Sequence, residues 1–151
     1  MKSQQSLIIE QLDRKLNAYK QLPEIPQKGW IHVVRTGLKM SLRQLANRLT
    51  VTVPSVKEME DREKNGSITI KNLKEAARAL NMKLVYGLIP MEGTIDSMIE
   101  RKAEELARKI VLRTANTMKL EDQLVSKRRL EKSIKELAGE IKNEMPRYLW
   151  D

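Results

Sequence analysis

The chain has 151 residues, of which 29 are Lys or Arg and 20 are Asp or Glu, so its net charge at pH 7 is +9. It contains no Cys and a single His, His32, which excludes disulfides, thiolate catalysis and Cys-based zinc sites. No run of about 18 apolar residues and no signal-peptide pattern occurs, so we expect a cytoplasmic protein without membrane contact.

Apolar side chains at steps of three and four predict a mainly α fold. The first such pattern covers residues 3–22, and Pro23 and Pro26 then mark a linker. A second helix begins at Trp30. Ser41 should cap the third helix, with Gln44 completing a capping box.

After the turn at 50–52, Thr52 should cap a further helix with Pro54 in its first turn, where the missing N–H does no harm. That helix is expected to fray into the polar loop 61–66. Thr69 should cap the next helix, which runs from Ile70 to about Leu80.

A short apolar run then predicts one strand at about 84–89, carried by Leu84, Val85, Tyr86 and Leu88. Because a lone strand cannot satisfy its own backbone, we expect antiparallel pairing with a second copy, which would make a homodimer. Pairing within the chain and a plain extended segment remain alternatives of about equal weight.

Two apolar stripes predict helices over the remaining residues, with a break at Asn116 and Thr117. The expected organisation has three parts. Residues 1–27 form an amphipathic helix and linker, residues 28–90 form a DNA-binding domain, and residues 91–151 form a C-terminal helical extension for dimerisation or partner binding.

The positive charge is concentrated in the first part of the chain. Residues 1–90 hold 16 basic and 8 acidic residues, whereas residues 91–151 hold 13 and 12. No acidic residue lies between Glu24 and Glu58, a window with six basic residues: Lys28, Arg35, Lys39, Arg43, Arg48 and Lys57. With only five aromatic residues, this favours the phosphates of double-stranded DNA over stacked single-stranded bases.

Two capped helices joined by a tight turn over residues 41–60 are typical of a helix-turn-helix, in which Ala46 must be small for the helices to cross. Residues 28–82 resemble the lambda-repressor-like (XRE) family. Nearly the whole chain is similar to the mobile mystery protein A family, through Gly29-Trp30-Ile31, Gln44-Leu45-Ala46, Gly66-Ser67-Ile68-Thr69-Ile70, Glu75-Ala76-Ala77-Arg78-Ala79-Leu80, Leu84-Val85-Tyr86-Gly87-Leu88-Ile89-Pro90, Thr117-Met118-Lys119-Leu120-Glu121-Asp122-Gln123 and Leu149-Trp150-Asp151. That resemblance implies a regulator encoded on mobile elements beside a Fic-domain protein, similar to a toxin–antitoxin pair.

The XRE resemblance places a base-reading set on and beside the cap of the recognition helix, at about 52–62: Thr52, Val53, Pro54, Ser55, Lys57 and Glu58. This chain has Thr50 where members often have Gly, and Val53 where they often have Gln. The bidentate amide contact to adenine is therefore missing. Instead, Val53 could touch a thymine methyl, Lys57 a guanine and Glu58 a cytosine amino group.

Phosphate contacts are expected from basic side chains and helix N-termini around this helix pair: Lys39, Arg43, Gln44, Arg48, Ser67 and Thr69. The expected function is a sequence-specific, nucleoid-associated DNA-binding autorepressor. The alternative is an antitoxin-like module that restrains a Fic-domain partner through residues 91–151. Thr117 to Glu121 matches the Ser/Thr-x-x-x-Glu helix of inhibitory Fic partners only formally.

No sequence pattern predicts an enzyme, a metal site or a cofactor. The chain lacks both a phosphate-binding Gly-Lys-Ser/Thr loop and a Gly-x-Ser-x-Gly nucleophile turn. His32 has neither a second His nor a Cys with which to share a metal, and is expected to be a surface or helix-packing residue.

Overall fold

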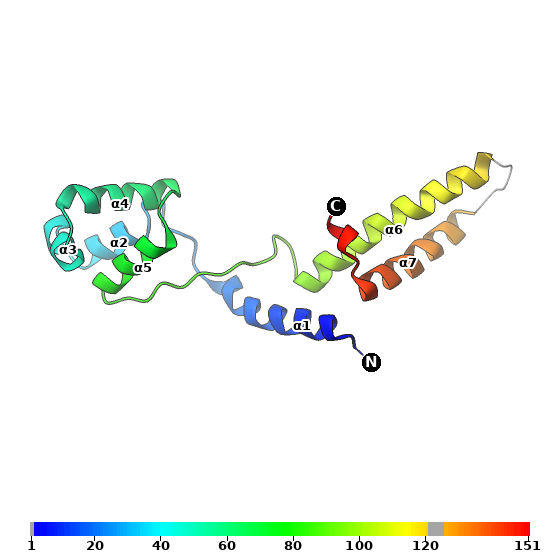
Figure 1. Ribbon diagram of the computed structural model, residues 1–151, viewed down its shortest axis with the longest axis horizontal. Coiled ribbons are helices and arrows are strands. Elements are labelled where there is room, and N and C mark those ends of the chain that lie inside the picture. Colours follow the sequence, from blue (N-terminus) through cyan, green and yellow to red (C-terminus); the bar gives the residue numbers. More distant parts are fainter. Residues whose placement is uncertain (1, 121–125) are drawn as a thin grey trace. The chain divides into compact units, whose positions relative to one another are not determined.

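The computed structural model describes residues 2–120 and 126–151, which are mainly α-helical (Figure 1). They divide into two compact units. Residues Leu22–Gly87 form the four-helix unit, and Met1–Gln21 together with Leu88–Asp151 form the hairpin unit. The helix expected in residues 1–27 therefore belongs to the same unit as the C-terminal helices.

The four-helix unit contains α2 (Trp30–Gly37), α3 (Leu42–Leu49), α4 (Val53–Asn65) and α5 (Ile70–Ala79). Its fully buried side chains come from all four helices: Ile31, Leu45, Ala46, Val56, Ala76 and Leu80, which follows α5. Ala46 is 2% exposed, as expected for a small residue where α3 and α4 cross. Apolar periodicity predicted the core positions of α3, α4 and α5, but not that of α2, where Ile31 is buried and Trp30 is 38% exposed.

The caps of this unit follow the sequence predictions. The Ser41 hydroxyl accepts a hydrogen bond from Gln44 N at 3.1 Å, and Ser41 N donates to Gln44 Oε1 at 2.8 Å, which completes the capping box. Thr52 and Thr69 cap α4 and α5 by accepting from the backbone N–H groups of Ser55 and Asn72. Helix α4 does not fray at residue 61 but continues to Asn65, and Gly66 ends it in a left-handed conformation.

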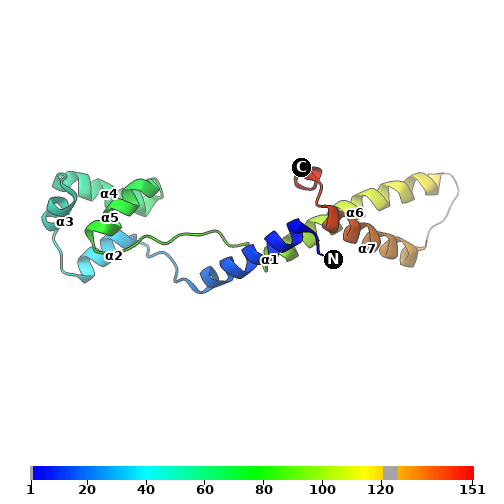
Figure 2. The ribbon, with the colours of Figure 1, turned by 60° about the horizontal axis from the view of Figure 1, so that its bottom comes forward.

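The hairpin unit consists of α1 (Gln4–Asn17), the short 3-10 turn η1 (Ala18–Gln21), α6 (Ile95–Leu120), α7 (Lys127–Glu144) and η2 (Arg147–Trp150). Figure 2 shows α7 running back along α6. Ion pairs from Arg108 to Glu131 and from Asp96 to Lys142 confirm this antiparallel pairing. The side chain of Asp13 in α1 accepts hydrogen bonds from the first two N–H groups of α6 and so fixes α1 to its start.

The structure differs from the sequence predictions at residues 116–117 and at residues 84–89, where it has the plain extended segment that was one of the alternatives. Helix α6 runs through Asn116 and Thr117 without the expected break, because neither residue removes a backbone hydrogen bond as Pro would. No strand forms at 84–89 in the described residues, and the backbone of 83–91 makes no backbone–backbone hydrogen bond with any of them. A strand needs a partner that this single chain does not supply.

The extended segment exposes the side chains that were expected to pack in the strand. Leu84 is half-buried, while Val85, Tyr86 and Leu88 are exposed, Leu88 to 83%. Pairing of this segment with a second copy stays a prediction. Glu121, the end of the formal Fic-type match, lies outside the described residues. Across the described ranges, no helix has the length and apolar character needed to cross a bilayer.

Candidate nucleic-acid interface

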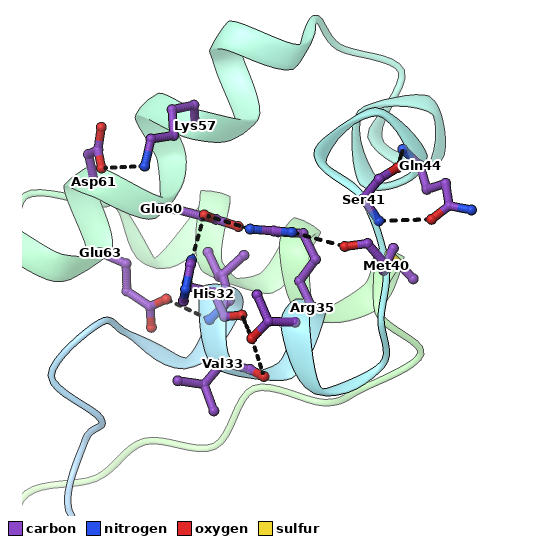
Figure 3. A network of polar contacts seen from close by, with 12 residues as sticks. His32, Val33, Arg35, Met40, Ser41, Gln44, Lys57, Glu60, Asp61 and Glu63 are labelled. Carbon is purple, nitrogen blue, oxygen red and sulfur yellow. Dashed lines mark hydrogen bonds and ion pairs between the residues drawn. The ribbon is translucent and has the colours of Figure 1, made fainter.

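A buried ion pair fixes α4 against α2 (Figure 3). Arg35 is 8% exposed and Glu60 is 3% exposed. The Arg35 Nε donates to Glu60 Oε1 at 2.5 Å, and Nη1 donates to the Met40 carbonyl at 2.9 Å. His32 Nδ1 lies 3.1 Å from the other Glu60 oxygen. His32 therefore packs between helices, as the sequence suggested.

The ionised form of Glu60 is favoured despite its burial. Burial of the carboxyl raises its pKa, but the hydrogen bonds from Arg35 and His32 and the charges behind them outweigh this effect. The pKa of Glu60 is therefore below its ordinary value. Consequently, this carboxylate is negatively charged at neutral pH and its charge is neutralised inside the unit.

A second carboxylate of α4 also points toward α2. Glu63 accepts hydrogen bonds from the backbone N–H groups of Trp30 at 2.9 Å and Ile31 at 2.8 Å, and thereby caps α2 from another helix. Gly29 precedes α2 with φ of 85°, and a Cβ there would lie 2.7 Å from Glu63 Oε1. Only glycine fits both the backbone and the close approach of this carboxylate.

The turn between α3 and α4 is short and depends on a strained residue. Thr50 has φ of 59° and ψ of 42°, the left-handed conformation that normally favours glycine. Val51 N closes the turn by donating to the Ala46 carbonyl at 3.0 Å. Thr52 then begins α4. Glycine would adopt this backbone conformation without strain.

Replacing Thr50 by Gly is expected to raise the free energy of unfolding of the four-helix unit by about 1 kcal/mol, because it removes left-handed strain from a β-branched residue. Fluorescence of Trp30 during urea unfolding, in a Trp150→Phe background, reports on this unit alone. The matched control is Thr36→Gly in α2, where the residue is helical and the same substitution is expected to lower the free energy of unfolding by about 0.5 kcal/mol. If both substitutions destabilise equally, the strain argument fails.

Most of the predicted base-reading set lies on the exposed side of α4. Thr52, Pro54, Ser55, Lys57 and Glu58 are exposed. Lys57 lies 3.5 Å from Asp61, and Glu58 accepts from Arg62 at 2.6 Å. These ion pairs are exposed and therefore weak, so both side chains can exchange partners.

Two members of that set already have structural roles. Val53 is only half-exposed and packs against the core of the unit, so most of its apolar surface is unavailable to a ligand. The Thr52 hydroxyl caps α4 and lies 2.8 Å from the Ser55 hydroxyl. Of the predicted base-reading set, this leaves the side chains of Pro54, Ser55, Lys57 and Glu58 available to contact a ligand.

Three residues of the predicted phosphate set lie together. Lys39, Gln44 and Arg48 line one shallow pocket, with Leu38, Met40 and Asn47. Gln44 uses its amide oxygen in the capping box, and Arg48 donates to the Ala79 carbonyl at 3.1 Å. The pocket therefore presents one ammonium, one guanidinium and two amide groups.

The other three members of the phosphate set do not line this pocket. Arg43 is exposed on α3. Ser67 and Thr69 lie in the loop between α4 and α5, where Ser67 donates to Asn65 at 2.6 Å and Thr69 caps α5. The structure thus joins Lys39, Gln44 and Arg48 but not the full set.

Two features were missed from the sequence. Arg35 was counted with the six basic residues of the carboxylate-free window, but its charge is buried against Glu60, which lies just beyond that window. Asn47 was not included, although it follows Gln44 by three residues and therefore shares its helix face. This three-residue spacing from Gln44 was the sequence signal that could have identified Asn47 as part of the pocket.

The comparisons with known proteins identify no relative. No family model matches the chain, and neither a curated protein nor a solved structure is similar enough to count as a match.

Proposed function

We propose that the protein binds double-stranded DNA through α3 and α4, which would act as a lambda-repressor-like helix-turn-helix. The observation that carries this proposal is the excess of exposed basic over exposed acidic side chains in the four-helix unit. This unit has 12 basic and 6 acidic residues. Two of the six carboxylates, Glu60 and Glu63, point toward α2, whereas Lys39, Arg43, Arg48 and Lys57 are exposed.

In this proposal α3 and the loop before it would contact the phosphates, and α4 would contact the bases. Lys39, Gln44 and Arg48 would bind phosphates from their common pocket, with Arg43 adding a contact from the first turn of α3. Ser55, Lys57 and Glu58 would face base edges in the major groove. With so few base-reading groups, two copies on two half-sites would be needed for strong specificity.

The biological role proposed on this basis is a regulator that represses its own gene. Binding and restraint of a Fic-domain partner through residues 91–151, which the family resemblance implies, stays a prediction.

Arg43→Ala and Lys57→Ala are each expected to weaken binding to DNA from upstream of the protein's own gene. For Arg43, loss of a phosphate contact should lower the affinity for all DNA sequences. It should also reduce, by about 1, the slope of the logarithm of the binding constant against the logarithm of the salt concentration. For Lys57, loss of a base contact should cost about 1–3 kcal/mol on the preferred site and less on unrelated DNA. Fluorescence anisotropy over a salt series measures both effects.

Lys109→Ala is the matched control, because it removes the same charge from an exposed position of α6 in the hairpin unit. It should leave the affinity close to that of the wild type. The proposal is contradicted if the wild type shows no salt-sensitive binding, or if Lys109→Ala weakens binding as much as the other two variants.

A further inference from the structure

The near-neutral charge of residues 91–151 conceals two regions of opposite charge. Residues 106–135 hold nine basic and three acidic residues, whereas residues 91–105 and 136–151 together hold four basic and nine acidic residues. Helix α7 runs back along α6 (Figure 2), and Arg108 of α6 pairs with Glu131 of α7 at 3.0 Å. The described residues 106–117 and 126–135 therefore lie at the same end of the hairpin unit, which collects the positive charge.

Most of the exposed positive charge at this end belongs to the first half of α7. Residues 126–135 contain five basic residues and one acidic residue. Four of the basic residues are exposed on the side of α7 away from the buried Ile134, and we call them the basic patch: Arg128, Arg129, Lys132 and Lys135. Three of them follow one another at steps of four and three, so they share one helix face over about 10 Å.

These charges disfavour the helix that carries them. A helix N-terminus has partial positive charge, yet the first turn of α7 contains no acidic residue. Lys132 is a helix neighbour of both Arg128 and Lys135, so like charges repel one another. Glu131, the one acidic residue within 126–135, binds Arg108, and within the described ranges no patch residue takes part in an ion pair. A bound anion would relieve both effects.

The surroundings of the basic patch indicate which anion fits it. Helix α7 exposes no large apolar side chain. An acidic protein partner needs apolar or aromatic anchors, a membrane needs an apolar helix face, and single-stranded bases need aromatic side chains on which to stack. The backbone of a DNA duplex needs only positive charge, because it presents one negative charge per about 1.7 Å of its axis.

We propose that the basic patch binds the phosphate backbone of double-stranded DNA, as a second contact in addition to α3 and α4. The choice of DNA rests on the proposed function, which brings a duplex to the same chain. Contact through phosphates carries no base preference, so the patch adds affinity without sequence specificity. Glu136 begins the next turn of α7 and ends the patch, which confines the contact to the first half of the helix.

Neutralising the patch in the full-length chain tests this proposal. Arg128→Gln, Arg129→Gln, Lys132→Gln and Lys135→Gln in one chain form the patch variant, in which Gln keeps a high helix propensity. Its affinity should fall by about tenfold or more, both for DNA from upstream of the gene and for unrelated DNA. The slope of the logarithm of the binding constant against the logarithm of the salt concentration should fall by about 2–4. Fluorescence anisotropy over a salt series measures both quantities.

The matched control removes four positive charges from exposed positions of the same unit outside the patch. It carries Lys15→Gln, Lys20→Gln, Lys102→Gln and Lys109→Gln. Its net charge equals that of the patch variant, but its affinity and its salt slope should stay close to those of the wild type. Circular dichroism of both variants checks that the helices are retained.

A fluorescent probe distinguishes direct contact from a general effect of charge. The chain contains no Cys, so a thiol-reactive dye can be attached at a single introduced position. Ser133→Cys places the dye beside the patch, because Ser133 is exposed and follows Arg129 by four residues. Saturating DNA should reduce quenching of this dye by acrylamide. A dye at Lys102→Cys, in the acidic half of the hairpin unit, should be quenched equally with and without DNA.

The proposal is overturned if the patch variant and its control bind DNA alike, or if DNA leaves quenching of the dye at position 133 unchanged. The same assay judges the proposed function separately. Loss of affinity in Arg43→Ala and Lys57→Ala but not in the patch variant would leave α3 and α4 as the DNA-binding helices and overturn the patch. Loss of affinity in the patch variant alone would support the patch and contradict binding through α3 and α4.

Discussion

Replacing Glu60 by Gln is expected to lower the free energy of unfolding of the four-helix unit by about 3–5 kcal/mol, the usual cost of leaving one member of a buried ion pair without its partner. Arg35 would stay 8% exposed with no counterion, and His32 would lose its carboxylate neighbour. Urea unfolding followed by Trp30 fluorescence in a Trp150→Phe background measures this loss, because the chain has only two Trp residues.

The matched control is Glu58→Gln, which removes an exposed carboxylate two residues earlier on the same helix. Its pair with Arg62 is solvated, so the change should stay within about 0.5 kcal/mol. The double variant Arg35→Met with Glu60→Leu removes both charges and should regain much of the loss. If Glu60→Gln and Glu58→Gln changed the free energy of unfolding equally, the buried ion pair would contribute no more to stability than the exposed one.

The Glu60 carboxyl should make the four-helix unit less stable in acid. The pKa of Glu60 is lower in the folded state than its ordinary value, so the folded state favours the ionised form. Its contribution is therefore complete above the unfolded pKa of about 4.3 and is lost as the pH falls through the folded value. Below pH 4.3 the wild type should lose stability more steeply than the Glu60→Gln variant.

Local sequence signals predicted where α3, α4 and α5 begin, although not where α4 ends. Ser41, Thr52 and Thr69 each cap the helix that follows, because a hydroxyl three residues before a free N–H needs no distant partner. The spacing of apolar residues at steps of three and four likewise predicted that Leu45 and Val56 lie in the core, since this pattern depends only on the helical repeat.

Features that depend on distant residues could not be predicted in this way. Arg35 and Glu60 are 25 positions apart, so the sequence shows a basic residue where the structure has a neutralised pair. The strand at 84–89 required a partner outside the chain's own helices, and the structure shows an extended segment instead. For the candidate site, the exposed residues of α4 were predicted, but the pocket of Lys39, Gln44 and Arg48 required the folded loop before α3.

Leu45→Ala is expected to lower the free energy of unfolding of the four-helix unit by about 2–5 kcal/mol, because a fully buried leucine leaves a cavity that its neighbours fill only in part. Trp30 fluorescence in the Trp150→Phe background should report this loss. In a Trp30→Phe background, Trp150 reports on the hairpin unit, and its unfolding transition should stay unchanged.

Ile134→Ala should give the reciprocal result, because Ile134 is 1% exposed in the core of the hairpin unit and belongs to a different buried cluster from Leu45. The Trp150 transition should then lose about 2–5 kcal/mol while the Trp30 transition keeps its midpoint. Separate transitions follow from separate cores, since each unit buries its own apolar side chains. If either variant shifted both transitions equally, the two units would unfold as one cooperative body, contrary to this expectation.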